Sequence, residues 1–308
     1  MLGIMQRQLE QPEPGSLVYG LLGGYYVETG HLARAHELSK LLVMKSAPTG
    51  YAPLYWDAAR FGDFATAHAW VERTFQDFPD TFFKRFMAVH VLNWQGRSDE
   101  AMREVHAILD AGQPSRSDPD IAVIFGALLS RGGEYEAAVA LLEPVIDPAH
   151  PEDSDQSPVT ALFGLHALAW AYQHTGATEK ATWLLVGYTQ GCAQDEKSGK
   201  YRNAPDLERC AEAQLLLGHD DEALAGLEKA IAAGWREYYL RLHDPYWARL
   251  RDDPRYRQLM AKMKADVDRQ HAEAAAKDRE DHFATRLEVV RKERLGERYR
   301  PWSSAGTS

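Results

Sequence analysis

The histidines and carboxylates of this chain show none of the spacings that build common catalytic centres. The sequence has no His-Glu-x-x-His pair, no Gly-x-Ser-x-Gly turn, no glycine-rich phosphate loop before a lysine and no dinucleotide fingerprint. His31 and His36 are five residues apart, which is poor spacing for two ligands on one helical face. The acidic run 220–222 opens a helical pattern, where carboxylates complement the helix dipole. We therefore expect no catalytic residue, no metal site and no cofactor.

The two cysteines, Cys192 and Cys210, are too few to form a metal site of the usual spacing. One falls at the end of a predicted helical hairpin and the other on the first helix of the next hairpin, so their thiols are able to approach each other. Two alternatives stay open, a disulfide or two small buried apolar side chains in a reducing compartment.

The bulk composition is that of a soluble folded protein. Of 308 residues, 45% are hydrophobic and 26% are charged, and the formal net charge is −10. Such a charge argues against direct binding of nucleic acid. There is no run of eighteen apolar residues, and the first seven residues lack the charged and apolar regions of a secretory signal. We expect no membrane contact and a cytoplasmic location, or a periplasmic one if an upstream targeting segment is missing.

One local pattern organises most of the chain. Gly23 and Tyr26 share one helical face, Gly30 ends that helix, and Ala35 begins the apolar face of a returning helix. Glycine enters the left-handed region cheaply, and alanine lets two helices approach closely. The glycine-to-alanine spacing recurs five times, at Gly62 to Ala67, Gly96 to Ala101, Gly133 to Ala138, Gly176 to Ala181 and Gly218 to Ala223. The chain is therefore predicted to be all-α, with six helical hairpins in series.

These hairpins resemble tetratricopeptide repeats over about residues 16–235. The alanines recur at intervals of 32, 34, 37, 43 and 42 residues. The first three intervals are near the roughly 34-residue period of that family, and the last two require longer connections. Residues at its signature positions are Gly23, Tyr26, Ala35, Pro79, Leu168, Tyr172, Ala181 and Ala230, whereas Tyr55, Val89 and Ala211 stand where glycine is usual. The resemblance implies a right-handed superhelical α-solenoid that binds protein partners.

The family frame also implies which residues line a concave groove, because the first helix of each hairpin faces inward there. Carried over to this sequence, the groove contains aromatic, imidazole, amide and guanidinium side chains, a composition typical of binding hot spots. Its residues are Trp56, Arg60, Phe83, Phe86, His90, Asn93, Trp94, Arg131, Phe163, His166, Trp170, Gln173 and His174, with Val123, Ser130, Glu208 and Glu212 beside them. We expect Arg60, Asn93 and Arg131 to hold a carboxylate or a peptide backbone.

Two other interpretations of this groove stay open. The C-terminal helix fills it, or some of its rings are ordinary core residues. An enzyme that uses His90, His166, His174 and Glu208 is a further alternative, although no motif connects these residues.

The two ends of the chain differ from the array. Residues 1–15 are a lead-in that ends in a proline-glycine breaker cluster. Residues 236–260, with Trp247, Leu250, Tyr256 and Leu259, are predicted to cap the last repeat, and they resemble the closing segment of arrays in bacterial signalling proteins. Residues 261–300 are predicted to form a charged helix that is either solvated or engaged in a coiled coil or in docking on a partner. Residues 301–308 are predicted to be a disordered tail. Residues 251–308 carry 14 basic and 11 acidic side chains, against 21 and 34 in the rest of the chain.

The sequence therefore favours a non-enzymatic scaffold that binds a peptide or a partner helix in its concave groove. The alternative is the regulatory half of a bacterial signalling protein, of the transcriptional regulator, adenylate cyclase or kinase type, whose effector domain is absent. Self-association through the ends of the array is a further expectation, because a solenoid needs a polar cap at each end and no N-terminal cap is evident.

Overall fold

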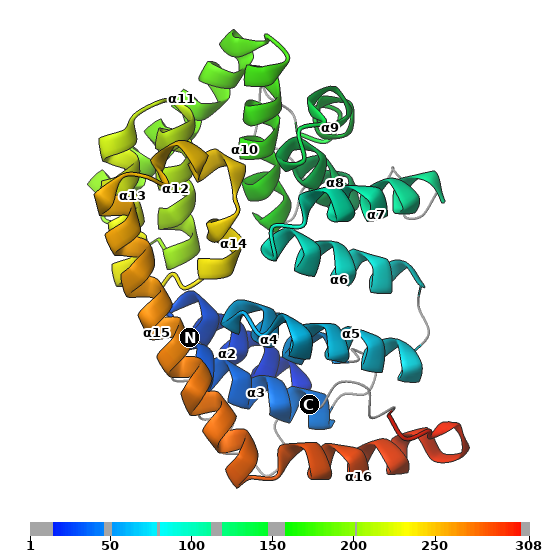
Figure 1. Ribbon diagram of the computed structural model, residues 1–308. Helices are drawn as coiled ribbons and strands as arrows, with labels where there is room; N and C mark the ends of the chain where they lie inside the picture. Colours follow the sequence, from blue (N-terminus) through cyan, green and yellow to red (C-terminus); the bar gives the residue numbers. More distant parts are fainter. Residues whose placement is uncertain are drawn as a thin grey trace. The chain divides into compact units, whose positions relative to one another are not determined.

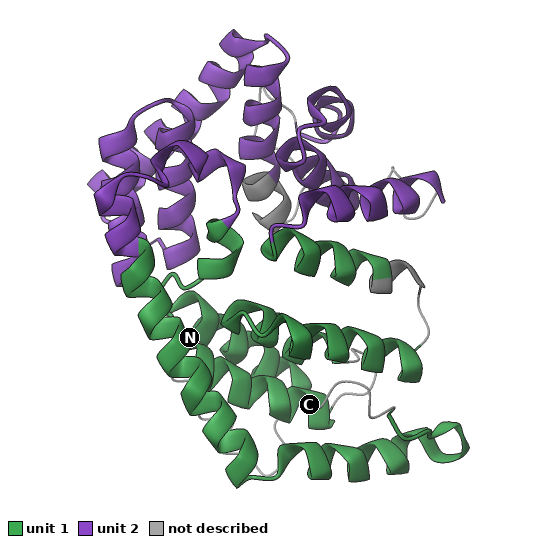
Figure 2. Cartoon of the chain, viewed as in Figure 1, with its two compact units in different colours: residues 1–95, 233–242, 260–308 green, residues 96–232, 243–259 purple. Residues whose placement is uncertain are grey.

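The computed structural model describes residues 15–45, 51–78, 81–111, 119–146, 158–200 and 202–302, with all of their side chains except those of 81–84 and 158–163. Within these ranges the chain is helical and contains no strand (Figure 1). It divides into two compact units (Figure 2). Unit 1 comprises residues 1–95, 233–242 and 260–308, and unit 2 comprises 96–232 and 243–259.

The predicted hairpins correspond to consecutive helices joined by tight turns. These are α2 (Ser16–Glu28) and α3 (Leu32–Lys45), α4 (Ala52–Phe61) and α5 (Phe64–Asp77), α6 (Thr81–Trp94) and α7 (Ser98–Asp110), α8 (Pro119–Arg131) and α9 (Tyr135–Leu142), α10 (Pro158–His174) and α11 (Thr178–Ser198), and α12 (Ala204–Leu216) and α13 (Asp220–Ala233). Unit 1 begins with α2 to α6, and unit 2 begins with α7 to α13.

The residues that predicted the hairpins have the backbone and burial that the pattern requires. All six turn glycines lie in the left-handed region, with φ between +75° and +88°. All six alanines that follow them are at most 1% exposed. The prediction of an all-helical chain folded into successive helix pairs is confirmed by this geometry.

Neighbouring helices pack closely within each unit. In unit 1, α2 packs on α3 and α4 packs on α5, and in unit 2, α8 packs on α9 and α10 packs on α11. The first helices α8, α10 and α12 also contact one another in series. A Cβ atom added to Gly126 of α8 would lie only 2.4 Å from Cγ of Leu142 on α9, so this helix pair has no room for a side chain at that position. Such packing is that of an α-solenoid.

The chain after the array forms several shorter and longer helices. They are α14 (Tyr238–Leu242), the 3-10 helix η1 (Pro245–Leu250), α15 (Pro254–Glu280), α16 (Phe283–Leu295) and the 3-10 helix η2 (Gly296–Arg298). The charged helix predicted over 261–300 is thus two helices, and the break contains His282 with a positive φ of 52°. The lead-in 1–14 and the end of the tail, 303–308, lie outside the described residues.

A buried charge cluster holds α15 on the first hairpins of unit 1. Lys40 of α3 is 3% exposed, and its Nζ lies 2.8 Å from Asp278 and 3.0 Å from Asp281. His36 lies 3.1 Å from Asp278 and 3.2 Å from Asp57 of α4. Burial by itself would lower the pKa of His36, but the hydrogen bonds and charges of the two carboxylates outweigh it and raise the pKa to about 9. His36 is therefore positively charged at neutral pH.

Helix α16 contributes to the core of unit 1. Phe283 and Leu287 belong to the same apolar cluster as residues of α4, α5 and α6. Arg291 and Asp77 have side chains that are each 2% exposed, and they form a two-pronged ion pair with both N–O distances at 2.7 Å. The ring of Trp302 lies 3.7 Å from the Arg291 guanidinium. The charged C-terminal region is therefore packed against its own chain instead of being fully solvated.

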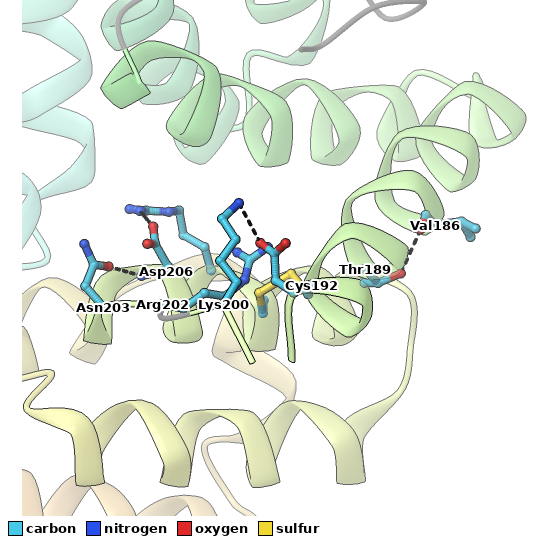
Figure 3. The surroundings of a disulfide bond; sticks show 10 residues. Val186, Thr189, Cys192, Lys200, Arg202, Asn203 and Asp206 are labelled. Atoms are coloured by element: carbon cyan, nitrogen blue, oxygen red, sulfur yellow. Dashed lines mark hydrogen bonds and ion pairs between the residues drawn. A yellow bond between two sulfur atoms is a disulfide. The ribbon is translucent and has the colours of Figure 1, made fainter. Parts of the chain in front are cut away.

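Unit 2 contains the disulfide that the sequence left open. Cys192 of α11 and Cys210 of α12 are bonded, with their Cα atoms 6.1 Å apart (Figure 3). Asp195, on the same helix as Cys192, accepts from Arg202 at 2.7 Å. Asn203 caps α12 by accepting from the Asp206 amide at 2.8 Å. The connection between α11 and α12 is thus held by one covalent bond and several polar ones.

None of the helices in the described part of the chain combines the length and apolar character needed to cross a membrane.

Candidate interaction surface

A chain of aromatic contacts joins the first helices α4 and α6 of unit 1. The His90 ring lies 4.6 Å from Phe86 and 5.2 Å from Trp56, and Trp56 lies 5.8 Å from Trp94. Trp94 is 6% exposed and belongs to the core, whereas Phe86, His90 and Trp56 are half-buried. The predicted aromatic groove residues of this unit therefore divide into one core ring and three rings that reach the surface.

Arg60 was expected to hold a carboxylate, and it binds one that belongs to its own chain. Its Nε donates to Oε1 of Glu237 at 2.8 Å, and its Nη1 lies 3.9 Å from Asp57. Glu237 immediately precedes α14, and α14 packs on both α4 and α6. A short segment that follows the array thus lies on the first helices of unit 1 and supplies a carboxylate to Arg60.

Three further predicted groove residues are Asn93, Phe83 and Phe163. Asn93 is half-buried on α6. The side chains of Phe83 in unit 1 and Phe163 in unit 2 lie outside the described residues, so their place in a groove stays a prediction.

In unit 2, an arginine at the matching repeat position also binds a carboxylate that follows the array. Arg60 and Arg131 each stand two residues before a turn glycine. The Nε atom of Arg131 lies 3.6 Å from Asp244, and its guanidinium lies 4.7 Å from the Tyr246 ring. Asp244 is 4% exposed and Tyr246 is 1% exposed. Both partners of Arg131 are therefore part of the interior of unit 2.

His166 forms a buried polar pair in unit 2. Its Nδ1 lies 3.0 Å from Glu212 of α12, and the two residues are 1% and 3% exposed. Glu208 is buried one turn earlier on α12, and Ser130 donates to the Ala167 carbonyl at 2.7 Å. The bond from Ser130 links α8 to α10, and the His166–Glu212 pair links α10 to α12. These polar side chains are therefore buried as hydrogen-bonded partners of neighbouring helices.

The aromatic residues at the end of α10 contact one another and the segment after the array. The Trp170 ring lies 4.2 Å from His174 and 5.1 Å from Tyr246. His174 is exposed and stacks on Tyr135 at 4.2 Å. Gln173 donates to the carbonyl of Leu216 at 2.8 Å. Val123 is 1% exposed and lies in the core.

The residues of the enzyme alternative have separate surroundings. His90 contacts aromatic rings in unit 1, whereas His166, His174 and Glu208 belong to unit 2. Within unit 2, His166 and Glu208 are buried and His174 is exposed. Among the described residues, no three His, Cys, Asp or Glu side chains converge as a metal site would require.

The residues that sequence reasoning missed are Glu237, Asp244 and Tyr246, which contact the first helices. The predicted capping role was assigned instead to Trp247, Leu250, Tyr256 and Leu259. The first three are at most 4% exposed, and Leu259 is half-buried. The regular position of Arg60 and Arg131, two residues before a turn glycine, was a signal of a shared role. Their partners lie 177 and 113 residues further along the chain, beyond the reach of local patterns.

No protein-family model, curated protein or solved structure matches this chain.

Proposed function

We propose that this chain is a non-enzymatic protein–protein interaction scaffold, in which a tetratricopeptide-like array of about six hairpins forms a right-handed superhelix. The observation that carries the proposal is the row of half-buried rings Trp56, Phe86 and His90 on α4 and α6. Aromatic side chains that reach the surface from rigid helices bury large areas at little cost in conformational entropy. The expected partner is a peptide or a helix that lies along these first helices.

Composition supports a binding role on this face. Trp56 and Phe86 supply apolar area, and His90 and Asn93 supply polar groups that set the register of a bound backbone. Because α4 and α6 hold their rings in place through the apolar core of unit 1, the surface is organised before a partner arrives.

The test is capture from native lysate by the full chain. A Trp56→Ala/Phe86→Ala variant is compared with wild type, and Trp183→Ala serves as the matched control, because Trp183 is 53% exposed on α11 in unit 2. We expect a protein that wild type and Trp183→Ala retain and the double variant loses. Identical retained proteins for all three chains would overturn the proposal. Thermal unfolding of the variants checks that the loss does not come from unfolding.

A further inference from the structure

Helix α14 of unit 1 lies against the first helices in the way that a bound peptide would. Glu237 pairs with Arg60 at 2.8 Å, and the Tyr239 ring fills the space beside Gly62, where an added Cβ would lie 2.1 Å from its Cζ atom. The Tyr239 ring also contacts Phe64 edge-on at 5.6 Å. Leu240 packs on the apolar cluster of α4, α5 and α6. The segment therefore uses one carboxylate, one aromatic ring and one aliphatic side chain.

Residues 237–240 are held less completely than the chain on either side of them. Tyr238, Tyr239 and Leu240 are only half-buried. By contrast, Arg236 before them is paired with Asp266 at 2.6 Å, and Arg241 after them is 3% exposed, with its guanidinium 5.2 Å from the Trp235 ring. Trp235 is 4% exposed in unit 1, and Trp247 is fully buried in unit 2. Detachment of residues 237–240 would leave Trp235, Arg241 and Trp247 in place.

The carboxylate of Glu237 is also incompletely satisfied. Its Oε1 accepts from Arg60, but among the described residues its buried Oε2 has no hydrogen-bond partner. When the segment packs on α4, this oxygen loses its hydrogen bonds to water and gains none from the protein, which costs free energy. In the detached segment the carboxylate would keep its bonds to water. This cost weakens the contact of α14 with α4 and leaves room for a ligand that binds Arg60 better.

We infer that α14 is an internal ligand of the α4–α6 face, and that the partner is a short segment with the same order of acidic, aromatic and aliphatic residues, which displaces it. The partner's carboxylate binds Arg60, its aromatic ring lies over Gly62, and its aliphatic residue takes the place of Leu240. The inference rests on the proposed function, since both use the first helices of unit 1, and it adds the chemistry of the partner and the means by which the free chain covers the part of the face beside Arg60 and Gly62.

Unit 2 shows why the exchangeable segment is in unit 1. There Arg131 has the same repeat position, but its partners Asp244 and Tyr246 are almost fully buried. Removing them would expose the adjacent Trp247 as well, which carries a large hydrophobic cost. The contact with Arg131 is therefore a permanent part of unit 2, and the contact with Arg60 is the one that a partner can replace.

The test uses the full chain and the synthetic heptapeptide Arg-Glu-Tyr-Tyr-Leu-Arg-Leu, which reproduces residues 236–242. In a Glu237→Gln/Tyr239→Ser variant the internal segment is weakened, and we expect it to bind the peptide at least about tenfold more tightly than wild type does, measured by calorimetry. A control peptide with Gln and Ser at the two matching positions should not bind. Adding Arg60→Ala to the variant should remove binding. Equal binding of both peptides, equal affinity of wild type and variant, or no binding at all would overturn the inference.

Hydrogen exchange of wild type gives a second measurement that does not depend on the variant's folding. The amides of α14 should exchange at least about tenfold faster than those of η1, because α14 detaches locally. Equal protection of the two segments would contradict the inference. Failure of the peptide experiment leaves the capture test at Trp56 and Phe86 unaffected, and peptide binding through Arg60 would persist if that capture test failed.

Discussion

Gly62 and Gly176 end equivalent first helices in the two units, yet their surroundings are opposite. Both have a left-handed backbone, with φ of +77° and +85°. A Cβ at Gly62 would collide with the Tyr239 ring, whereas a Cβ at Gly176 would meet nothing within 4 Å. The same local turn is therefore covered at Gly62 and open at Gly176. Turn geometry comes from the local sequence, but whether a turn also serves as a contact surface depends on distant residues.

The two units also differ in what ties their helices together. In unit 1, buried ion pairs attach α15 and α16 to the first hairpins, through Lys40, His36 and Asp77. In unit 2, the Cys192–Cys210 bond joins α11 to α12. An ion pair holds only while both partners are charged, whereas a disulfide holds until it is reduced. The stability of unit 1 should therefore depend on pH, and that of unit 2 on redox conditions.

The largest expected effect comes from breaking the buried ion pair of unit 1. Arg291→Ala leaves the carboxylate of Asp77 buried without its charged partner, and it should lower the free energy of unfolding by about 3–5 kcal/mol. Chemical denaturation measures this loss. Arg286→Ala is the control, because the Arg286 side chain is 52% exposed and its ion pair with Asp281 is long, at 3.8 Å. Its removal should cost at most about 1 kcal/mol. Equal losses in the two variants would show that α16 is not held by the buried pair.

The second prediction concerns pH and His36. Because the folded pKa of His36, about 9, lies above its ordinary 6.5, its contribution is fully present below pH 6.5 and disappears as the pH rises through 9. Wild type should lose on the order of 3 kcal/mol of unfolding free energy over this window, through weakened contacts with Asp57 and Asp278. Lys40, which shares Asp278, stays charged there, since hydrogen bonds to carboxylates outweigh burial and raise its pKa.

Denaturation of wild type and His36→Gln at several pH values separates this effect from other titrations. The variant should lack the loss between pH 6.5 and 9. A variant with the same pH profile as wild type would show that His36 does not carry the charge that docks α15.

The third prediction concerns the disulfide of unit 2. Cys192 and Cys210 are 18 residues apart, and opening a loop of that length should destabilise unit 2 by roughly 3 kcal/mol. Thermal unfolding with and without reductant measures the effect. Cys210→Ser should reproduce the reduced protein and should not respond to reductant. A reductant effect that persists in Cys210→Ser would have to come from another cause.

The smallest effect is expected from the pair of turn glycines. Gly62→Ala and Gly176→Ala should both lose about 1–2 kcal/mol, because alanine is strained in a left-handed backbone. Gly62→Ala should lose about 1–3 kcal/mol more, because its methyl group overlaps the Tyr239 ring. The difference between the two variants in denaturant midpoints is the measurement. If the two losses were equal, α14 would move away from Gly62 at no cost.

Much of the fold was predictable because it depends on short-range spacing. The distance of five residues from a turn glycine to an alanine identifies both the end of one helix and the closest contact of the next. Gly96 and Ala101 illustrate this, with φ of +75° and 0% exposure. The cap residue Trp247 was predictable for a similar reason, since an aromatic residue after an Asp-Pro helix start covers the neighbouring helix.

The candidate surface was predictable only in part. The repeat frame placed Trp56 and Trp94 together as groove residues, but Trp94 turned out to be 6% exposed and Trp56 half-buried. Trp94 is a buried member of the apolar cluster that includes Phe283 and Leu287 of α16, whereas Trp56 packs against the same cluster but is only partly buried. A frame that assigns every repeat the same inward positions does not contain that information.

By itself, the sequence determined the helical hairpins, their turns and the absence of any known catalytic spacing, because these follow from backbone preferences and from residues within about one repeat of each other. Only the tertiary structure decided which carboxylates bind Arg60, Arg131 and Arg291, and that Cys192 bonds to Cys210. A charged side chain finds its partner by burial and proximity after the chain has folded, and several carboxylates of similar chemistry were available to each arginine. The identity of the pair therefore depends on packing between elements that are far apart in the chain.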